Sequence, residues 1–125
     1  MIITLNMLQN KRACADQVET FEGEFGDSVV VTLELCLIYA SIFDFCWAAH
    51  NLLSSEKYES YALERKEARK VFNRAENHAW MAYRNGYVDA NNQRLKEGDF
   101  RRAIDVQWKI FLRAKATAFA REALK

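Results

Sequence analysis

The chain has 125 residues, of which half are hydrophobic and 13% aromatic, and its formal net charge is +1. This length suits one domain with its own core, and the hydrophobic content excludes intrinsic disorder as the default. Proline is absent and only four glycines occur, whereas a β-sandwich or barrel needs turn residues every ~8–12 positions. We therefore expect a single all-α domain over residues 1–125, a helical bundle of about five to six helices.

The sequence has no feature typical of a secreted or membrane protein. Its N-terminus lacks a basic leader, and the longest apolar stretch, Leu35–Ala40, is far shorter than the ~20 residues that span a bilayer. The three cysteines are odd in number and widely spaced, which disfavours a disulfide framework. We expect a protein of the reducing cytoplasm, with no membrane partner.

Charge divides the chain into an acidic N-terminal helical module, residues 1–55, and a basic helical repeat region, residues 56–125. The first part has two basic and seven acidic residues, and the second has sixteen basic and ten acidic residues. This asymmetry leaves two interpretations open. Either the two parts face and neutralise each other, or one of them presents a charged surface to a partner.

In the first part of the chain, apolar spacing predicts a helix from about Met7 to Phe25, with Gly26 as its stop. Its apolar face consists of Cys14, Val18, Phe21 and Phe25. The run from Val29 to Val31 is β-branched and extended, but too short and isolated to imply a sheet.

Two polar residues predict the next helix starts. Thr32 is expected to cap a helix over residues 33–42, and Asp44 a short helix over residues 45–53, because each side chain can accept a hydrogen bond from the first turn.

A helical pattern then continues from Ser55 to about Gly86. A helix of this length spans ~45 Å, so it must bend, break or project from a small domain. A short helix is expected from Asp89 to Glu97, stopping at Gly98. Asp99 is expected to cap the last helix, residues 100–124.

The basic region contains an internal repeat. Residues 70–80 read K-V-F-N-R-A-E-N-H-A-W, and 39 residues later, residues 109–119 read K-I-F-L-R-A-K-A-T-A-F. The matching positions are Lys70/Lys109, Val71/Ile110, Phe72/Phe111, Arg74/Arg113, Ala75/Ala114, Ala79/Ala118 and Trp80/Phe119. The repeat predicts related helical units, and its alanines favour close approach of the helix axes.

No enzymatic motif is present: the sequence has no phosphate-binding glycine loop, H-E-x-x-H motif or nucleophile elbow. Cys46 and His50 are four residues apart, and Cys14 and Cys36 could complete a zinc site. Because C-x-x-C is absent and the cysteines occupy apolar registers, we expect core packing rather than a metal. The sequence favours a non-enzymatic protein without a cofactor.

Candidate binding residues come from both charged regions. Arg102, Lys109 and Arg113 form one stripe of the last helix, which could meet phosphates or an acidic protein surface. The acidic counterpart is Glu19, Glu22 and Glu24. For the basic stripe, the alternative is a solvated helix face. His78 is expected in the core or at its rim, and Tyr58, Tyr61, Tyr83 and Tyr87 suit either an interface or helix packing.

The segment from Ala13 to Leu53, with V-V-V-T-L-E-L-C-L and F-D-F-C-W-A-A-H-N-L-L, resembles the N-terminal module of small uncharacterised phage and prophage proteins. In those proteins an alanine- and aromatic-rich repetitive helical tail follows. The chain departs from the pattern at Phe45, where the family favours tryptophan, and at Cys46, where it favours a polar residue. The resemblance implies a viral or mobile-element origin in a bacterial host and transfers no catalytic residue.

These observations lead to three functional hypotheses. The leading one is a protein that binds a host protein or ribonucleoprotein defence complex as a stoichiometric inhibitor, in the manner of an anti-CRISPR protein. The alternatives are a nucleic-acid-binding phage accessory protein and a self-assembling helical structural protein.

Overall fold

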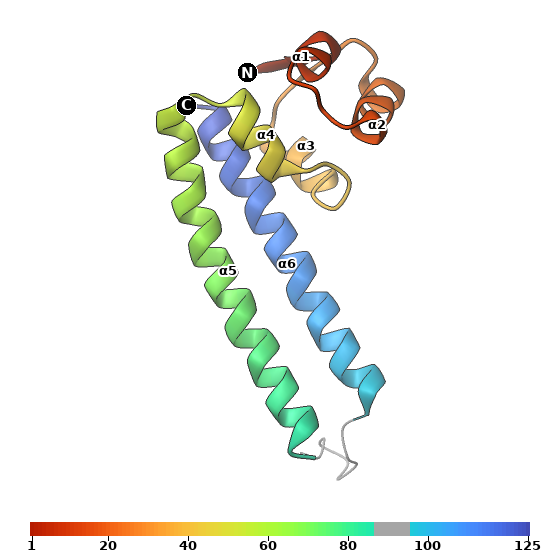
Figure 1. Ribbon diagram of the computed structural model, residues 1–125, viewed down its shortest axis with the longest axis vertical. Coiled ribbons are helices and arrows are strands. Elements are labelled where there is room, and N and C mark those ends of the chain that lie inside the picture. The colour runs from red at the N-terminus through yellow and green to blue at the C-terminus, as the bar shows by residue number, and fades with distance from the viewer. Residues whose placement is uncertain (87–95) are drawn as a thin grey trace.

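The computed structural model describes residues 1–86 and 96–125, in which six helices and one small sheet confirm the predicted all-α helical bundle. Helices α5 and α6 form a long antiparallel hairpin, and the other elements gather at one end of it, where both termini lie (Figure 1). The elements are β1 (Ile2–Thr4), α1 (Leu5–Asn10), α2 (Ala15–Phe25), β2 (Ser28–Val30), α3 (Leu33–Ile38), α4 (Phe45–Leu52), α5 (Ser55–Arg84) and α6 (Glu97–Ala123).

The single helix predicted over residues 7–25 is wrong, because the chain breaks between α1 and α2. Arg12 has a φ of +59°, the left-handed conformation that closes a Schellman turn. In this turn the amide of Ala13 donates to the Leu8 carbonyl at 2.9 Å, and that of Arg12 donates to Gln9 at 3.1 Å. The turn satisfies the last carbonyls of α1 and redirects the chain into α2.

A two-stranded sheet, which the sequence did not predict, closes the N-terminal module. Strands β1 and β2 pair antiparallel, with Ile3 opposite Val29. The pairing continues at both ends, where the amide of Leu5 donates to Asp27 at 2.8 Å and that of Val31 donates to Met1 at 2.9 Å. The valine run is extended as predicted, but its partner is too short to show strand periodicity.

The predicted helix caps at Thr32 and Asp44 are confirmed. The side chain of Thr32 accepts from the amide of Leu35 at 3.1 Å, and that of Asp44 accepts from the amide of Trp47 at 3.0 Å. Each bond satisfies one of the free amides at a helix start. The first of these helices ends at Ile38 rather than near residue 42.

The start of α6 differs from its prediction. Gly98 lies in the first turn instead of stopping a preceding helix, because α6 begins at Glu97 after the N-cap Lys96. Asp99 is not the cap: its carboxylate accepts from the amide of Lys96 at 3.1 Å from inside the first turn. The short helix predicted over residues 89–97 lies largely outside the described residues.

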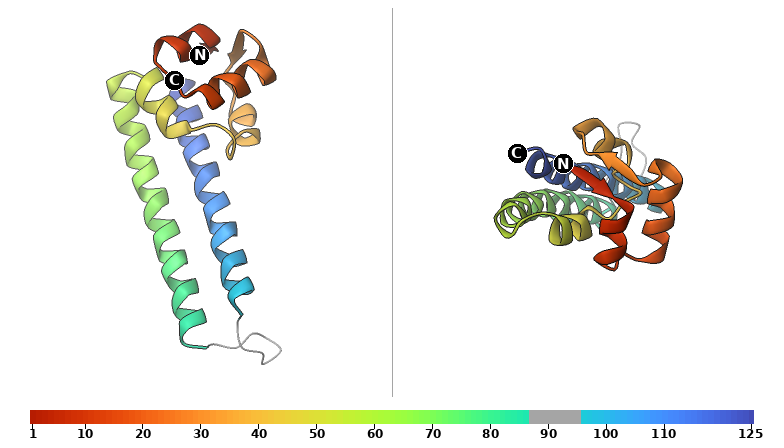
Figure 2. Two further views of the ribbon diagram at one scale, coloured as in Figure 1. Left: turned by 45° about the vertical axis from the view of Figure 1, so that its right-hand side comes forward. Right: turned by 90° about the horizontal axis from the view of Figure 1, so that it is seen from above.

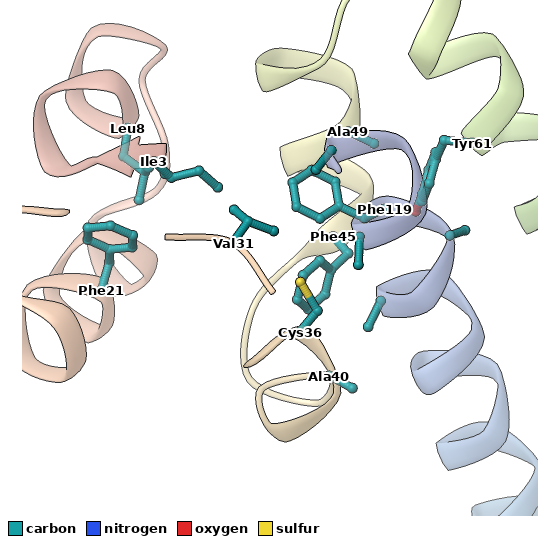
Figure 3. Close-up of a cluster of buried hydrophobic side chains, with 14 residues drawn as sticks. Ile3, Leu8, Phe21, Val31, Cys36, Ala40, Phe45, Ala49, Tyr61 and Phe119 are labelled. Carbon is teal, nitrogen blue, oxygen red and sulfur yellow. The ribbon is translucent and has the colours of Figure 1, made fainter. Parts of the chain in front are cut away.

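The core is concentrated where the N-terminal module meets the C-terminal half of α6. Figure 3 shows Ile3 and Phe21 on one side of Val31, and Phe45 and Phe119 on the other. The rings of Phe45 and Phe119 lie 5.5 Å apart between centroids. The buried alanines of α6 are Ala116, Ala118, Ala120 and Ala123. Their small side chains leave room for the elements that pack beside this helix.

The long helix α5 projects from the module, which is one of the three outcomes predicted for its length. Figures 1 and 2 show α5 and α6 continuing side by side beyond the other elements. Outside the module the two helices therefore pack mainly on each other. In the described part of the chain, no helix is both long enough and apolar enough to cross a membrane.

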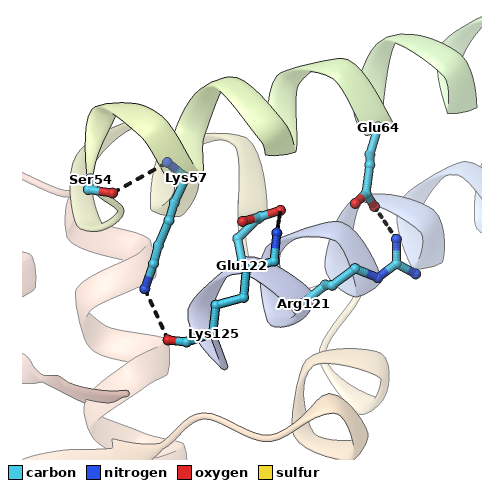
Figure 4. Close-up of polar contacts among 6 residues, drawn as sticks. All are labelled: Ser54, Lys57, Glu64, Arg121, Glu122 and Lys125. Carbon is cyan, nitrogen blue, oxygen red and sulfur yellow. Dashed lines mark hydrogen bonds and ion pairs between the residues drawn. The ribbon is translucent and has the colours of Figure 1, made fainter.

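Polar contacts join the base of α5 to the end of α6 (Figure 4). Arg121 pairs with Glu64 at 2.7 Å, and the Lys57 ammonium donates to the Lys125 carbonyl at 3.3 Å. Lys125 also pairs at 2.6 Å with Glu122, a carboxylate whose residue is only 1% exposed. Every ion pair found among the described residues joins two residues of the basic region. None links it to the acidic module.

Candidate functional site: the two flanks of the helical hairpin

Near the middle of the hairpin, a pair of equivalent residues of the repeat lies face to face, whereas the equivalent pair Trp80 and Phe119 lies at opposite ends. Phe72 and Phe111 are 39 positions apart, and their ring centroids are 5.9 Å apart. Arg69 and Trp108, which immediately precede the two copies, have the same separation in sequence, and the Arg69 guanidinium carbon lies 5.9 Å from the Trp108 ring. We call the contact of Phe72 with Trp108 and Phe111 the seam, and around it α5 and α6 have a local pseudo-two-fold relation. The seam has two different flanks.

The first flank carries a groove of about 980 Å³, which we call the basic groove. Among the described residues, Glu59 is the only carboxylate that lines it, and Trp108 and Phe111 contribute aromatic surface. Its cations are Arg65, Lys66, Arg69, Lys70 and Lys115. Four of the five come from one and a half turns of α5, and Lys115 comes from α6. The groove is therefore strongly positive in a chain whose net charge is only +1.

Aromatic rings and a thiol hold several of these cations in place. The Arg69 guanidinium carbon lies 5.3 Å from the Phe72 ring and 5.4 Å from Phe111. The Lys115 ammonium lies 5.1 Å from the Phe111 ring and 6.0 Å from Trp108. These are cation–π distances. The charges are thus arranged around Trp108, which remains 38% exposed.

Cys46, which comes from α4, also lines the basic groove. Its sulfur accepts from the hydroxyl of Tyr61 at 3.3 Å and from the guanidinium of Arg65 at 3.6 Å. Burial, followed by the contact with Cys46, raises the pKa of Tyr61 well above its usual value. The phenol therefore stays neutral, and it helps to fix the position of the thiol that holds Arg65.

The opposite flank carries a shallow apolar hollow of about 160 Å³ above Phe72 and Phe111. We call it the apolar strip, and its other lining residues are Ala68, Val71, Gln107, Ile110 and Ala114. Val71 is 54% exposed and Ile110 is 50% exposed. These two residues occupy equivalent positions of the repeat, so each helix contributes one β-branched side chain to the strip.

Farther along the hairpin, Trp80 and Phe100 pack together with ring centroids 5.3 Å apart. They line a third hollow of about 660 Å³, on which Glu76, Arg101 and Asp105 place mixed charge. This distal hollow thus lacks the charge bias of the basic groove.

The basic residues chosen from the sequence do not line the basic groove. Arg102 forms an ion pair with Asp99, and Lys109 pairs with Asp105 at 3.3 Å, so two of the three are paired on their own helix. Arg113 is exposed. Four of the five groove cations lie in the run R65-K66-E67-A68-R69-K70, the densest basic segment of the chain. That density was the available signal.

The acidic candidates lie on a different element. Glu19, Glu22 and Glu24 are all exposed on α2. Glu24 accepts from the hydroxyl of Tyr39 at 2.8 Å, and this hydrogen bond raises the pKa of Tyr39. The set is thus a solvent-facing part of the module and shares no groove with the hairpin cations.

The histidines and cysteines do not converge. Within residues 1–86 and 96–125, no three metal-ligating side chains come close enough to hold an ion. Cys36 is buried, and its burial raises the pKa of the thiol to about 11. Two predictions of burial are wrong: Cys14 is exposed because it precedes α2 at the break, and His78 is exposed on α5.

The tyrosines divide between core and rim. Tyr61 is fully buried, whereas Tyr58 and Tyr83 are half-buried. Tyr87 lies outside the described residues.

Comparison with protein families, with curated proteins and with solved structures finds no match to the chain. The resemblance to phage proteins stays a prediction.

Proposed function

We propose that the protein is a non-enzymatic binding protein that holds a helix of a partner protein on the apolar strip. The observation that carries this proposal is the half exposure of Val71 and Ile110 at the middle of the projecting hairpin. Ala68 and Ala114 lie beside them in the same hollow. Small side chains beside β-branched ones let a third helix approach closely.

The arrangement of the hairpin supports this function. Two helices alone cover only one stripe of each other, and a helix apolar on several sides needs further neighbours. Beyond the module, no third helix accompanies α5 and α6 in the described chain (Figure 1). A partner helix on the strip would complete a three-helix arrangement. A standard interface buries about 800 Å² on each partner.

The most concrete version of this proposal is a stoichiometric inhibitor of a bacterial defence complex. The hairpin would act sterically, because a projecting arm can occupy a surface that the complex uses for another subunit. In this version Arg102, Lys109 and Arg113 would form a charged rim. Rim charges change the association rate more than the affinity.

Affinity capture with matched baits tests the function. The bait pair is the wild-type chain and the double variant Val71→Glu with Ile110→Glu. The control is Leu33→Glu with Ile38→Glu, which introduces the same charges at two exposed apolar positions of α3. We expect a stoichiometric host protein with the wild type and the control, and its loss with the strip variant. Equal capture by all three baits would refute the role of the strip.

Light scattering separates a foreign partner from a second copy. A wild-type monomer is expected if the strip serves another protein. A wild-type dimer that becomes a monomer with Val71→Glu and Ile110→Glu would instead support self-assembly through the strip, because both copies of an isologous dimer use the same patch.

A further inference from the structure

We propose that the basic groove binds single-stranded nucleic acid, with its cations on the phosphates and Trp108 beneath a base. This site lies on the flank of the hairpin opposite the apolar strip and does not depend on the protein partner proposed above. The argument rests on charge, on spacing along α5 and on the aromatic surface within the groove.

The charge of the basic groove is largely uncompensated. In the part of the chain that the structure describes, Glu59 is its only lining carboxylate, and Lys70 pairs with Glu67 at 3.1 Å on its own helix. The other cations of the groove, Arg65, Lys66, Arg69 and Lys115, form no ion pair within the described residues. Because the net charge of the chain is only +1, attraction of a polyanion must come from this local concentration rather than from the whole surface.

The spacing of the cations suits a chain of phosphates. Lys66 and Lys70 are one helical turn apart, as are Arg65 and Arg69, which corresponds to about 6 Å along α5. The cations thus follow the axis of the hairpin in two parallel rows. Lys115 adds a charge from α6 on the other wall of the groove. A flexible backbone lying along the groove can meet several of these charges at once.

The aromatic surface distinguishes a nucleic acid from other polyanions. Trp108 lines the basic groove and is 38% exposed, with the Arg69 guanidinium 5.9 Å and the Lys115 ammonium 6.0 Å from its ring. A base can stack on an exposed indole while the adjacent cations hold its phosphates, and such stacking tolerates any base. An acidic peptide would use the charges but not the ring. A duplex keeps its bases stacked inside and offers the indole ring no free base face.

Fluorescence anisotropy with a labelled 20-nucleotide oligo-dT strand tests the site. We expect binding at 50 mM salt that weakens about 20- to 50-fold at 200 mM salt, the result for three to four neutralised phosphates on a single strand. The variant Lys66→Glu with Lys70→Glu should lose at least about tenfold in affinity at 50 mM salt, because two phosphate contacts become repulsive.

The matched control is Arg102→Glu with Lys109→Glu, which makes the same change in net charge outside the groove. It should stay within about twofold of the wild type. No binding of oligo-dT at 50 mM salt, or equal losses in the two variants, would overturn the proposal. Tighter binding of a 20-base-pair duplex, or of polyglutamate, would also overturn it. The strip variant with Val71→Glu and Ile110→Glu should lower oligo-dT affinity by no more than about threefold, which separates this test from that of the proposed function.

Discussion

Replacement of Phe119 by alanine tests whether one end of the hairpin carries most of the stability. Phe119 is 1% exposed, packs on Phe45 and, from α6, borders an apolar cavity of about 170 Å³ that is otherwise lined by residues of the N-terminal module. Truncation would enlarge this cavity, and the cost of a buried Phe→Ala change rises with the residual volume within a range of about 3–5 kcal/mol. We expect the upper half of that range. For a chain of this length it lowers the melting temperature by about 15–20 °C.

The control is Phe72→Ala, because Phe72 is nearly as buried, at 5% exposed. Its ring contacts Trp108 and Phe111 at the seam, between the basic groove and the apolar strip. Solvent and neighbouring side chains can fill the space that it leaves, so we expect a smaller loss of about 2–3 kcal/mol. Urea unfolding at 25 °C measures both values. A loss for Phe72→Ala that equals or exceeds that for Phe119→Ala would refute a core centred on the module.

Three further predictions concern the rest of the chain. Arg12→Gly should raise the free energy of unfolding by about 0.5–1 kcal/mol in a urea titration, because glycine adopts a positive φ without strain. Amide hydrogen exchange should be slower at the buried Ala116–Ala120 segment of α6 than at Arg101–Asp105, where the hairpin has left the module. Burial raises the pKa of the Cys36 thiol from 9.0 to about 11, so the free energy of unfolding should fall as pH rises through this interval. Urea titrations at pH 8 and 10.5 measure this fall, and Cys36→Ala should remove the part that comes from the thiol.

The elements that could be predicted are those whose cause is local. Thr32 and Asp44 cap their helices through bonds to amides three residues away, so a short window of sequence contains the whole interaction. The break at Arg12 lacks such a signal, because a helix end with positive φ is usually predicted from glycine or asparagine and here the residue is arginine. The strand at Ile3 pairs with Val29, 26 positions later, and the residues around Ile3 contain no pattern that predicts this pairing.

The candidate sites could not be predicted from the sequence because each of them depends on contacts between two helices. The repeat identified Phe72 and Phe111 as equivalent, but only the antiparallel packing of α5 and α6 places one ring against the other. The basic groove likewise combines cations of α5 with Trp108 of α6. A search along single helices finds stripes such as Arg102, Lys109 and Arg113, and it cannot find a surface divided between two helices.

The two helices contribute alike to the apolar strip and unequally to the basic groove. On the apolar strip, Val71 is matched by Ile110, so both helices offer nearly the same side chain. On the other flank, four of the five groove cations come from α5 and only Lys115 comes from α6, so the two helices contribute unequal positive charge. A partner helix centred on the strip contacts both copies alike. The single variants Val71→Glu and Ile110→Glu should therefore weaken its binding by amounts that agree within about threefold, since equivalent contacts lose similar free energy. A difference of more than about tenfold in titration calorimetry would show that the partner binds one helix and that the pseudo-two-fold relation has no part in recognition.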